Sequence, residues 1–134
     1  RLCVDLSRVV NRHLAKWSFS YRNVQDALNL IHPGSFLAKV DLSRMFHQIP
    51  LYPAIQKYFA YCYLGVIWTC LRAPFGGTST PAFANLLAGV TAMMLLARGI
   101  PSVWMTDDSL YQGHDMHSCR SALHTAINIM ERLG

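Results

Sequence analysis

Charged residues are scarce in this 134-residue sequence, which is 14% charged and 52% hydrophobic. Acidic side chains are the scarcest, with 7 Asp and Glu against 12 Lys and Arg, so the formal net charge is +5. This composition excludes intrinsic disorder, because disordered segments combine low hydrophobicity with high charge. The length suffices for one domain with a real core. The low charge also predicts that part of the apolar surface meets other protein segments.

Cysteine pairs with the C-x-x-C spacing of zinc ribbons and thioredoxin-like motifs are missing, which excludes both classes. The 4 cysteines stand far from one another, at Cys3, Cys62, Cys70 and Cys119. Cys62 and Cys70 could face each other across a hairpin. Reduced, buried thiols in an intracellular protein are the favoured interpretation.

Long hydrophobic runs are also missing. The longest, Leu86 to Ala97, is much shorter than the roughly 20 residues of a membrane span, so it predicts a buried core helix. There is no signal-peptide pattern. We therefore expect an intracellular protein of the cytoplasm or nucleus, not secreted and without a membrane partner. Because both ends fall inside or at the edge of expected elements, we also expect a fragment of a longer polypeptide.

Basic residues gather at the start of the chain. Five positive charges and one negative charge leave about +4 within the first 22 residues. Such asymmetry fits a polyanionic partner, although a solvated basic face is an equally open interpretation. The residues are Arg1, Arg8, Arg12, Lys16 and Arg22, with Asp5 as the acidic one.

Hydrophobic periodicity and turn residues predict a mixture of helices and strands. Strands are expected at 2–6, 36–41, 57–64, 66–71, 102–106 and 109–112. Helices are expected at 23–31, about 78–98 and 116–133, with one helical turn at 43–47. The last helix should be amphipathic, with Leu123, Ile127 and Met130 on one face. We expect an α/β fold of the α+β kind, in which helices pack on one face of an antiparallel sheet.

Three of the scarce acidic residues fall at strand ends. Asp41 ends one expected strand, and Asp107 and Asp108 form the expected tip of a hairpin, where neighbouring side chains can splay. Converging carboxylates suit divalent cations, and a Mg²⁺ site in a basic protein indicates phosphoryl transfer on nucleic acid. Two other interpretations stay open. Asp107 and Asp108 could be ordinary turn residues, and Asp41 could be an N-cap for the turn at Ser43.

Several sequence blocks, taken in order, form a recognisable set. They are R-L-C-V-D at 1–5 with Asn11, V-D-L-S-R-M-F-H-Q-I-P-L at 40–51, K-Y-F-A-Y at 57–61, R-A-P-F-G-G-T-S-T-P-A-F at 72–83 and W-M-T-D-D at 104–108. In this order the blocks resemble the fingers–palm core of reverse transcriptases, the RNA-directed DNA polymerases. The blocks at 40–51, 72–83 and 104–108 are similar to motifs A, B and C of that family. The resemblance covers essentially the whole chain and looks retrotransposon-like.

The resemblance implies a catalytic site built on motifs A and C. Asp41, Asp107 and Asp108 would be the catalytic carboxylates and would hold two Mg²⁺ ions, or Mn²⁺, with the Leu42 backbone carbonyl as a further ligand. Motif C usually has Tyr or Phe where this sequence has Met105, which fills apolar space but lacks the ring and hydroxyl. The implied activity is transfer of a nucleotide from a dNTP to a primer 3′-hydroxyl.

The resemblance also implies a nucleotide-binding set. Phe46 falls where the family keeps an aromatic steric gate, which leaves no room for a 2′-hydroxyl. Arg1 matches a basic residue that contacts the triphosphate, since a guanidinium can donate two parallel hydrogen bonds to a phosphate. Phe75 and Gly76 match a loop near the nucleotide and template. The full set is Arg1, Ser43, Arg44, Met45, Phe46, Phe75 and Gly76.

The resemblance makes the whole chain one reverse transcriptase domain fragment. Residues 1–35 would be a fingers-like part, and residues 36–134 would be a palm of βαββ type with motifs A, B and C. Expected partners are an RNA or DNA template with its primer, a dNTP, and the fingers, the thumb and any RNase H segment of the same polyprotein. The isolated fragment is expected to be inactive. Two alternatives remain: a non-catalytic polymerase-like module for RNA binding or scaffolding, and another Mg²⁺ nucleotidyltransferase on a related palm.

Overall fold

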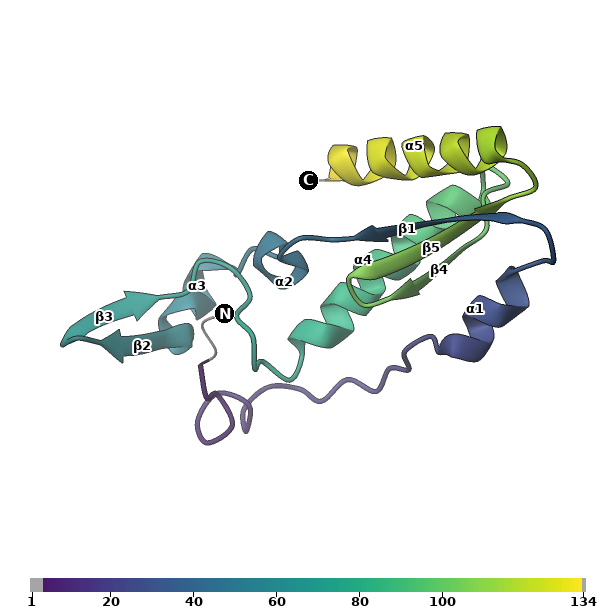
Figure 1. Cartoon of the computed structure of the whole chain (residues 1–134). Coiled ribbons are helices and arrows are strands. Elements are labelled where there is room, and N and C mark those ends of the chain that lie inside the picture. The colour runs from purple at the N-terminus through teal and green to yellow at the C-terminus, as the bar shows by residue number, and fades with distance from the viewer. Residues whose placement is uncertain (1–3, 134) are drawn as a thin grey trace. The chain divides into compact units, whose positions relative to one another are not determined.

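The computed structural model describes residues 4–133 (Figure 1). The chain divides into two compact units that interleave along the sequence. Unit 1 comprises Arg1–Phe19 and Arg44–Ala84, and unit 2 comprises Ser20–Ser43 and Asn85–Gly134. The described residues form a mixed α+β fold with five α-helices and a small antiparallel sheet, which confirms the expected class. The predicted division into fingers and palm stays a prediction.

The sheet of unit 2 brings together segments that are distant in the sequence. Strands β1 (Phe36–Asp41), β4 (Ser102–Met105) and β5 (Asp108–Gly113) lie in the order β1-β5-β4, and both pairings are antiparallel. Phe36 pairs with Gly113 at one end of β1, and Asp41 pairs with Asp108 at the other. The end of β1 therefore lies beside the start of β5. All three strands were expected to within one residue at each end.

One face of this sheet contributes to the core of unit 2. Ser109 and Tyr111 of β5 are buried, and their cross-strand neighbours, among them Val40 and Trp104, point to the same side. The Tyr111 hydroxyl donates a hydrogen bond of 2.8 Å to Ser109 Oγ, which in turn donates one of 3.3 Å to the Val40 carbonyl. The Trp104 and Tyr111 rings meet edge to face with centroids 6.5 Å apart. Polar atoms on this face are thus paired inside an apolar setting.

Helix α5 (Met116–Leu133) packs along β5 and β1 (Figure 1). Its buried residues recur at helical spacing and are Cys119, Ala122, Ala126 and Ile129. The expected helix is confirmed, but its buried stripe lies one position before the predicted one at Leu123, Ile127 and Met130, which are only half-buried. Small side chains let the helix backbone approach the sheet closely. At Gly113 the approach is so close that an added Cβ would lie 2.6 Å from Cys119 Cα.

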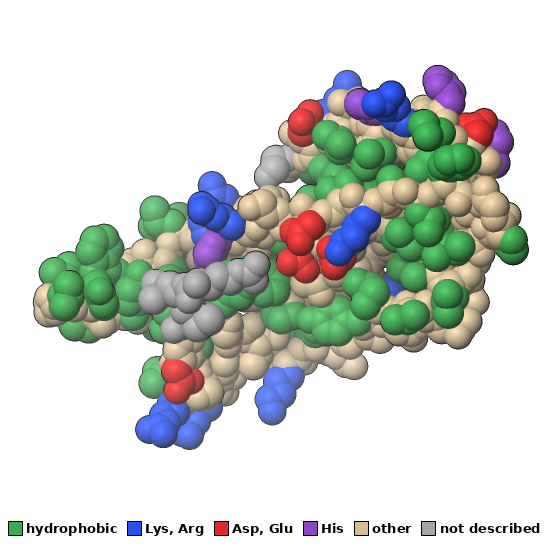
Figure 2. Space-filling model, viewed as in Figure 1, with side chains coloured by type: hydrophobic (Ala, Val, Ile, Leu, Met, Phe, Trp, Pro, Cys, Tyr) green, Lys and Arg blue, Asp and Glu red, His purple; other side chains and the backbone are tan. Residues whose placement is uncertain are grey.

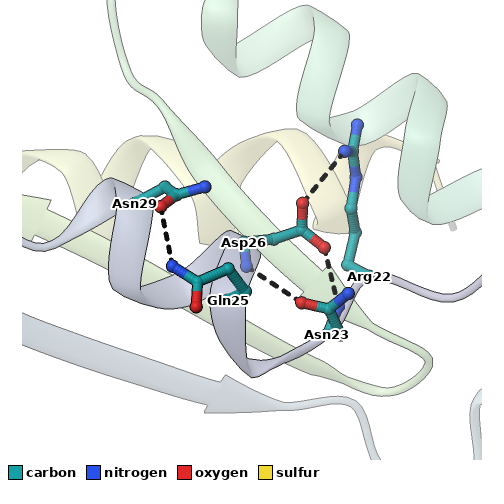
Figure 3. Close-up of polar contacts among 5 residues, drawn as sticks. All are labelled: Arg22, Asn23, Gln25, Asp26 and Asn29. Atoms are coloured by element: carbon teal, nitrogen blue, oxygen red, sulfur yellow. Dashed lines mark hydrogen bonds and ion pairs between the residues drawn. The ribbon is translucent and has the colours of Figure 1, made fainter.

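Helix α1 (Val24–Leu30) begins with a reciprocal capping box (Figure 3). Asn23 Oδ1 accepts from the Asp26 backbone N–H at 3.2 Å, and Asp26 Oδ2 accepts from the Asn23 backbone N–H at 2.7 Å. Arg22 adds an ion pair to Asp26 at 3.4 Å. The two bonds satisfy N–H groups that a helix start otherwise leaves without partners. They explain why the helix expected at 23–31 begins where it does.

Helix α4 (Thr80–Leu96) is apolar on nearly all sides. Ala84, Ala88 and Leu95 are buried, yet a second set of large side chains is exposed, comprising Leu86, Leu87, Val90, Met93 and Leu96. A helix that is hydrophobic all round is normally buried on all sides. This exposure agrees with the expectation that some apolar surface meets other protein segments. No helix in residues 4–133 has the length and apolar character to cross a membrane.

Unit 1 contains short helices and a two-stranded hairpin. Its elements are α2 (Met45–Gln48), α3 (Pro53–Gln56), the 3₁₀ helix η1 (Lys57–Phe59), β2 (Ala60–Tyr63) and β3 (Val66–Thr69). The hairpin turns at Leu64 and Gly65, both with positive φ, as a type I′ turn requires. Two predictions were wrong here. Residues 57–59 form the 3₁₀ helix rather than a strand, and residues 4–6 form no strand.

Candidate active site

Two of the three candidate carboxylates lie directly opposite each other on neighbouring strands. Asp41 ends β1, Asp108 begins β5, and the two residues form the last pair of the antiparallel register. Paired residues point to the same side of a sheet, here the side opposite Tyr111 and Ser109. Figure 2 shows acidic side chains beside a basic one over the β1 and β5 region. Like charges directly opposite destabilise a sheet, so this pair needs a compensating cation.

Asp107 lies in the two-residue turn that joins β4 to β5. The expected tip was Asp107 and Asp108, but the turn consists of Thr106 and Asp107, and Asp108 already belongs to β5. Thr106 has φ of 60° while Asp107 does not have positive φ, the sign pattern of a type II′ turn. A β-branched residue in this region is a genuine outlier, and such strain concentrates at functional sites.

A backbone hydrogen bond ties this turn to the end of β1. The Leu42 N–H donates to the Asp107 carbonyl at 2.7 Å, one residue beyond the last strand pair. The bond continues the β1–β5 ladder into the turn and holds Asp107 close to Asp41 along the backbone. The predicted ligand role of the Leu42 carbonyl is a separate matter and stays a prediction.

Lys39 lies on the same face as the carboxylates and was missed at the sequence level. Its Nζ is 2.8 Å from Asp108 Oδ1, across the diagonal of the β1–β5 pairing. The short polar contact with Asp108, and then its charge, raises the pKa of Lys39, and the charges of Asp41 and Asp107 raise it further. The signal was available, because Lys39 shares the two-residue alternation of Asp41 in β1.

The Asp108 carboxylate is only partly satisfied. Its Oδ1 is shielded from solvent and accepts no well-directed hydrogen bond, so the contact with Lys39 is an ion pair rather than a good hydrogen bond. A buried carboxylate oxygen without a directed donor is costly, and a cation is its natural partner. Carboxylate oxygens are the ligands that Mg²⁺ prefers, so the chemistry of the donors fits the expected metal.

The acidic side chains of this site do not form a complete set of metal ligands. Within residues 4–133, no three His, Cys, Asp or Glu side chains are arranged to hold a metal ion. The fold places Asp41 opposite Asp108 and places Asp107 in the adjoining turn. Binding of one metal ion by all three carboxylates would require these side chains to rearrange. Met105 pairs with Asp108 and is 41% exposed, so it borders the carboxylates on the open face.

Two of the predicted nucleotide-binding residues of unit 1, Phe46 and Phe75, form an aromatic pair. The rings of Phe46 and Phe75 have centroids 5.1 Å apart, and His47 meets Phe75 edge to face at 5.3 Å. Arg44 adopts the left-handed conformation just before α2, and Met45 is buried. The sequence blocks at 40–51 and 72–83 thus meet within unit 1 through their aromatic side chains.

The loop at 75–78 is held by a residue near the start of unit 1. Asn11 Nδ2 donates to the Gly76 carbonyl at 2.8 Å, and Asn11 Oδ1 accepts from the Thr78 N–H at 3.1 Å. Gly76 has φ of 96°, and a Cβ there would lie 2.8 Å from the Val4 carbonyl oxygen. A glycine is therefore required at this position. Ser43 belongs to unit 2, and the predicted contact of Arg1 lies outside the described residues.

Comparisons with known proteins show where this fold occurs. No protein-family model and no curated protein matches the chain. Solved structures of foamy virus protease–reverse transcriptase do match. The complex with dsDNA has a TM-score of 0.80 and 18% identity, over 95% of this chain and 26% of the viral one. The complex with an RNA/DNA hybrid has a TM-score of 0.75 and 20% identity, over 92% of this chain and 16% of the viral one.

A third structure, of the selenomethionine-labelled mutant of prototype foamy virus protease–reverse transcriptase, has a TM-score of 0.76 and 21% identity over 95% of this chain. The chain spans about a sixth to a quarter of the viral chains, 16% in one case and 26% in another. The similarity shows that this chain shares the fold of part of that retroviral polyprotein.

Proposed function

We propose that this chain is the motif A–B–C part of an RNA-directed DNA polymerase. One observation carries the proposal: Asp41 and Asp108 are direct cross-strand partners on an open sheet face, with Asp107 in the adjoining turn. A structural role does not account for carboxylates placed against each other at a cost in stability. The structural likeness to foamy virus protease–reverse transcriptase supports the same assignment.

The proposed reaction is attack of a primer 3′-hydroxyl on the α-phosphorus of a dNTP. A new phosphodiester bond forms, the bond to the β-phosphate oxygen breaks, and pyrophosphate leaves. Mg²⁺ held by Asp41, Asp107, Asp108 and the Leu42 carbonyl would supply activation of the hydroxyl and neutralisation of developing charge. The chain's own contribution is to fix the carboxylates on paired strands, so that little reorganisation is needed during the reaction.

The residues of unit 1 would position the nucleotide. The Phe46 ring, held against Phe75, would select deoxyribose by leaving no room for a 2′-hydroxyl. The loop at Phe75 and Gly76, tied down by Asn11, would pack near the nucleotide and template. The remaining members of the predicted set, Arg1, Ser43, Arg44 and Met45, are proposed contacts on the same resemblance.

A template–primer and further polypeptide complete the proposal. The foamy virus structures include complexes with dsDNA and with an RNA/DNA hybrid, which supports a duplex partner here. Basic residues would hold that duplex through its phosphates. Because the chain matches only 16% to 26% of those viral chains, we infer that catalysis requires fingers and thumb segments of the same polyprotein, to which any RNase H segment would be an addition.

The alternative is a non-catalytic polymerase-like module that binds RNA or acts as a scaffold. The lack of three converging metal ligands in residues 4–133 favours it. The decisive experiment is primer extension on an RNA template by the full-length polypeptide that contains these residues, with Asp107→Asn as the matched variant. We expect the variant to lose activity by about two orders of magnitude or more. Equal dNTP incorporation by both proteins would refute the polymerase.

The same assay tests the steric gate. Replacing Phe46 by Ala should raise incorporation of ribonucleotides relative to deoxyribonucleotides, because space for the 2′-hydroxyl opens. Unchanged sugar selectivity in an active Phe46→Ala enzyme would remove Phe46 from the nucleotide site.

A further inference from the structure

The open face of the unit 2 sheet carries its own cation. Lys39 Nζ lies 2.8 Å from Asp108 Oδ1, while Asp108 pairs directly with Asp41. The ammonium therefore lies among the charges that a metal ion would otherwise neutralise. The Lys39 side chain is 61% exposed, so nothing in its burial prevents it from moving into solvent.

We propose that Lys39 is a resident counter-cation that competes with a divalent metal ion for Asp108. This inference rests on the proposed function, because it concerns the same carboxylates. Asp108 Oδ1 is shielded and in contact with the ammonium, so it is unavailable to a metal while that contact persists. A divalent cation beside an ammonium is also repelled, so metal binding requires Lys39 to leave.

The proposal accounts for an otherwise puzzling feature of the site. Asp41 and Asp108 lie opposite each other and Asp107 is in the next turn, yet no three such side chains in residues 4–133 are set to hold a metal. With Lys39 in contact, Asp108 Oδ1 is withheld from any such set. Lys39 thereby stabilises the metal-free protein, where two facing carboxylates would otherwise repel, and sets the cation concentration at which the site assembles.

The test is a Mn²⁺ titration of the 134-residue protein, followed by the loss of the free-ion EPR signal. Wild type is compared with Lys39→Met, which keeps the chain length without the charge, and with Lys39→Arg, which keeps the charge. Lys57→Met is the matched control, because Lys57 lies in unit 1 near the Tyr58 ring. Circular dichroism checks that each variant is folded, and Lys39→Gln replaces Lys39→Met if that protein does not fold.

We expect Lys39→Met to bind Mn²⁺ about tenfold more tightly, as removal of a unit charge a few ångströms from a divalent ion implies even at high dielectric. Lys39→Arg and Lys57→Met should bind like wild type, and Asp41→Asn should bind at least about tenfold more weakly, since it removes a ligand charge. Equal or weaker binding by Lys39→Met would overturn the competition.

The two proposals fail in different ways. If wild type binds Mn²⁺, Asp41→Asn weakens the binding and Lys39→Met does not change it, the role of Lys39 is refuted and the metal site stands. If neither wild type nor any Lys39 variant binds Mn²⁺, the resident-cation role is refuted together with the metal site on which it depends.

Discussion

The two faces of the β1–β5–β4 sheet share one backbone pairing, but their polar side chains are arranged in opposite ways. On the buried face, the Tyr111 hydroxyl, Ser109 and the Val40 carbonyl form a hydrogen-bonded chain inside an apolar setting. On the open face, Asp41 and Asp108 repel each other, and Asp108 Oδ1 has an ion pair but no directed hydrogen bond. One face satisfies its polar atoms with directed hydrogen bonds, and the other leaves a carboxylate oxygen with an ion pair alone.

This difference separates residues that stabilise the fold from residues whose side chains the fold positions at the surface. A buried polar network that is fully satisfied stabilises one structure, because any rearrangement would strand a polar atom. Facing carboxylates destabilise the folded structure by repelling each other, and proteins tolerate such a local cost in stability where function requires it. Substitutions on the two faces should therefore change stability in opposite directions, and the following changes test that contrast.

The largest effect is expected on the buried face at Tyr111. This side chain has no exposed area, so Tyr111→Ala should lower the free energy of unfolding by about 3–5 kcal/mol through lost burial and the resulting cavity. Tyr111→Phe is the control, and it should cost only about 1 kcal/mol through the lost hydrogen bond. Urea unfolding of the 134-residue protein, followed by circular dichroism, measures both. A Tyr111→Ala protein as stable as wild type would contradict the assignment of this face as core.

A smaller effect is expected at the junction of β5 and α5. A Cβ on Gly113 would meet the backbone of Cys119, which cannot yield as a flexible side chain would. Gly113→Ala should therefore cost about 1–3 kcal/mol as strain in a close-packed region.

Gly89→Ala is the matched control for this junction, since a Cβ there has open space within helix α4. It should stabilise by about 0.5–1 kcal/mol through helix propensity. The same urea titration compares both variants. Equal responses at the two glycines would show that Gly113 is not required for the contact with α5.

The smallest effect is expected on the open face, and its sign is reversed. Asp41→Asn removes one of two facing charges, so it should raise the free energy of unfolding by about 0.5 kcal/mol at low salt. The gain should shrink in about 1 M salt, where exposed charges are screened. Unfolding titrations at both salt concentrations provide the measurement. Lower stability at low salt would mean that Asp41 makes a favourable contact which Asn cannot replace.

Much of unit 2 could be predicted from local sequence signals. The alternation in 36–41 and the apolar residues around Asp107 and Asp108 fixed β1, β4 and β5 to within one residue. The position of the turn was less predictable, because Thr106 adopts positive φ against its own preference. The predicted buried stripe of α5 was also wrong by one position. Hydrophobic periodicity favours large residues such as Leu123, whereas the close contact with the sheet uses Ala122 and Ala126.

The contacts of the candidate site were harder to predict than its residues. No local sequence signal predicts that β1 pairs with β5, or that the register places Asp41 opposite Asp108. Lys39 was overlooked because a lysine in a half-exposed strand is ordinary, and only the pairing shows which carboxylate it meets. In unit 1, Asn11 was noted as part of a motif, but its bonds to Gly76 and Thr78 link segments more than 60 positions apart.

The separation between β1 and β5 also governs how the site assembles in time. The β4–β5 hairpin closes over a two-residue turn, an event of about 1–10 μs in isolated hairpins. Asp41 meets Asp108 only after the chain has closed a loop of 67 positions, which costs entropy before any pairing is gained. We therefore expect Asp107 and Asp108 to be presented early in folding and Asp41 to join them late. A mutation that weakens β1 can abolish the site while the hairpin survives.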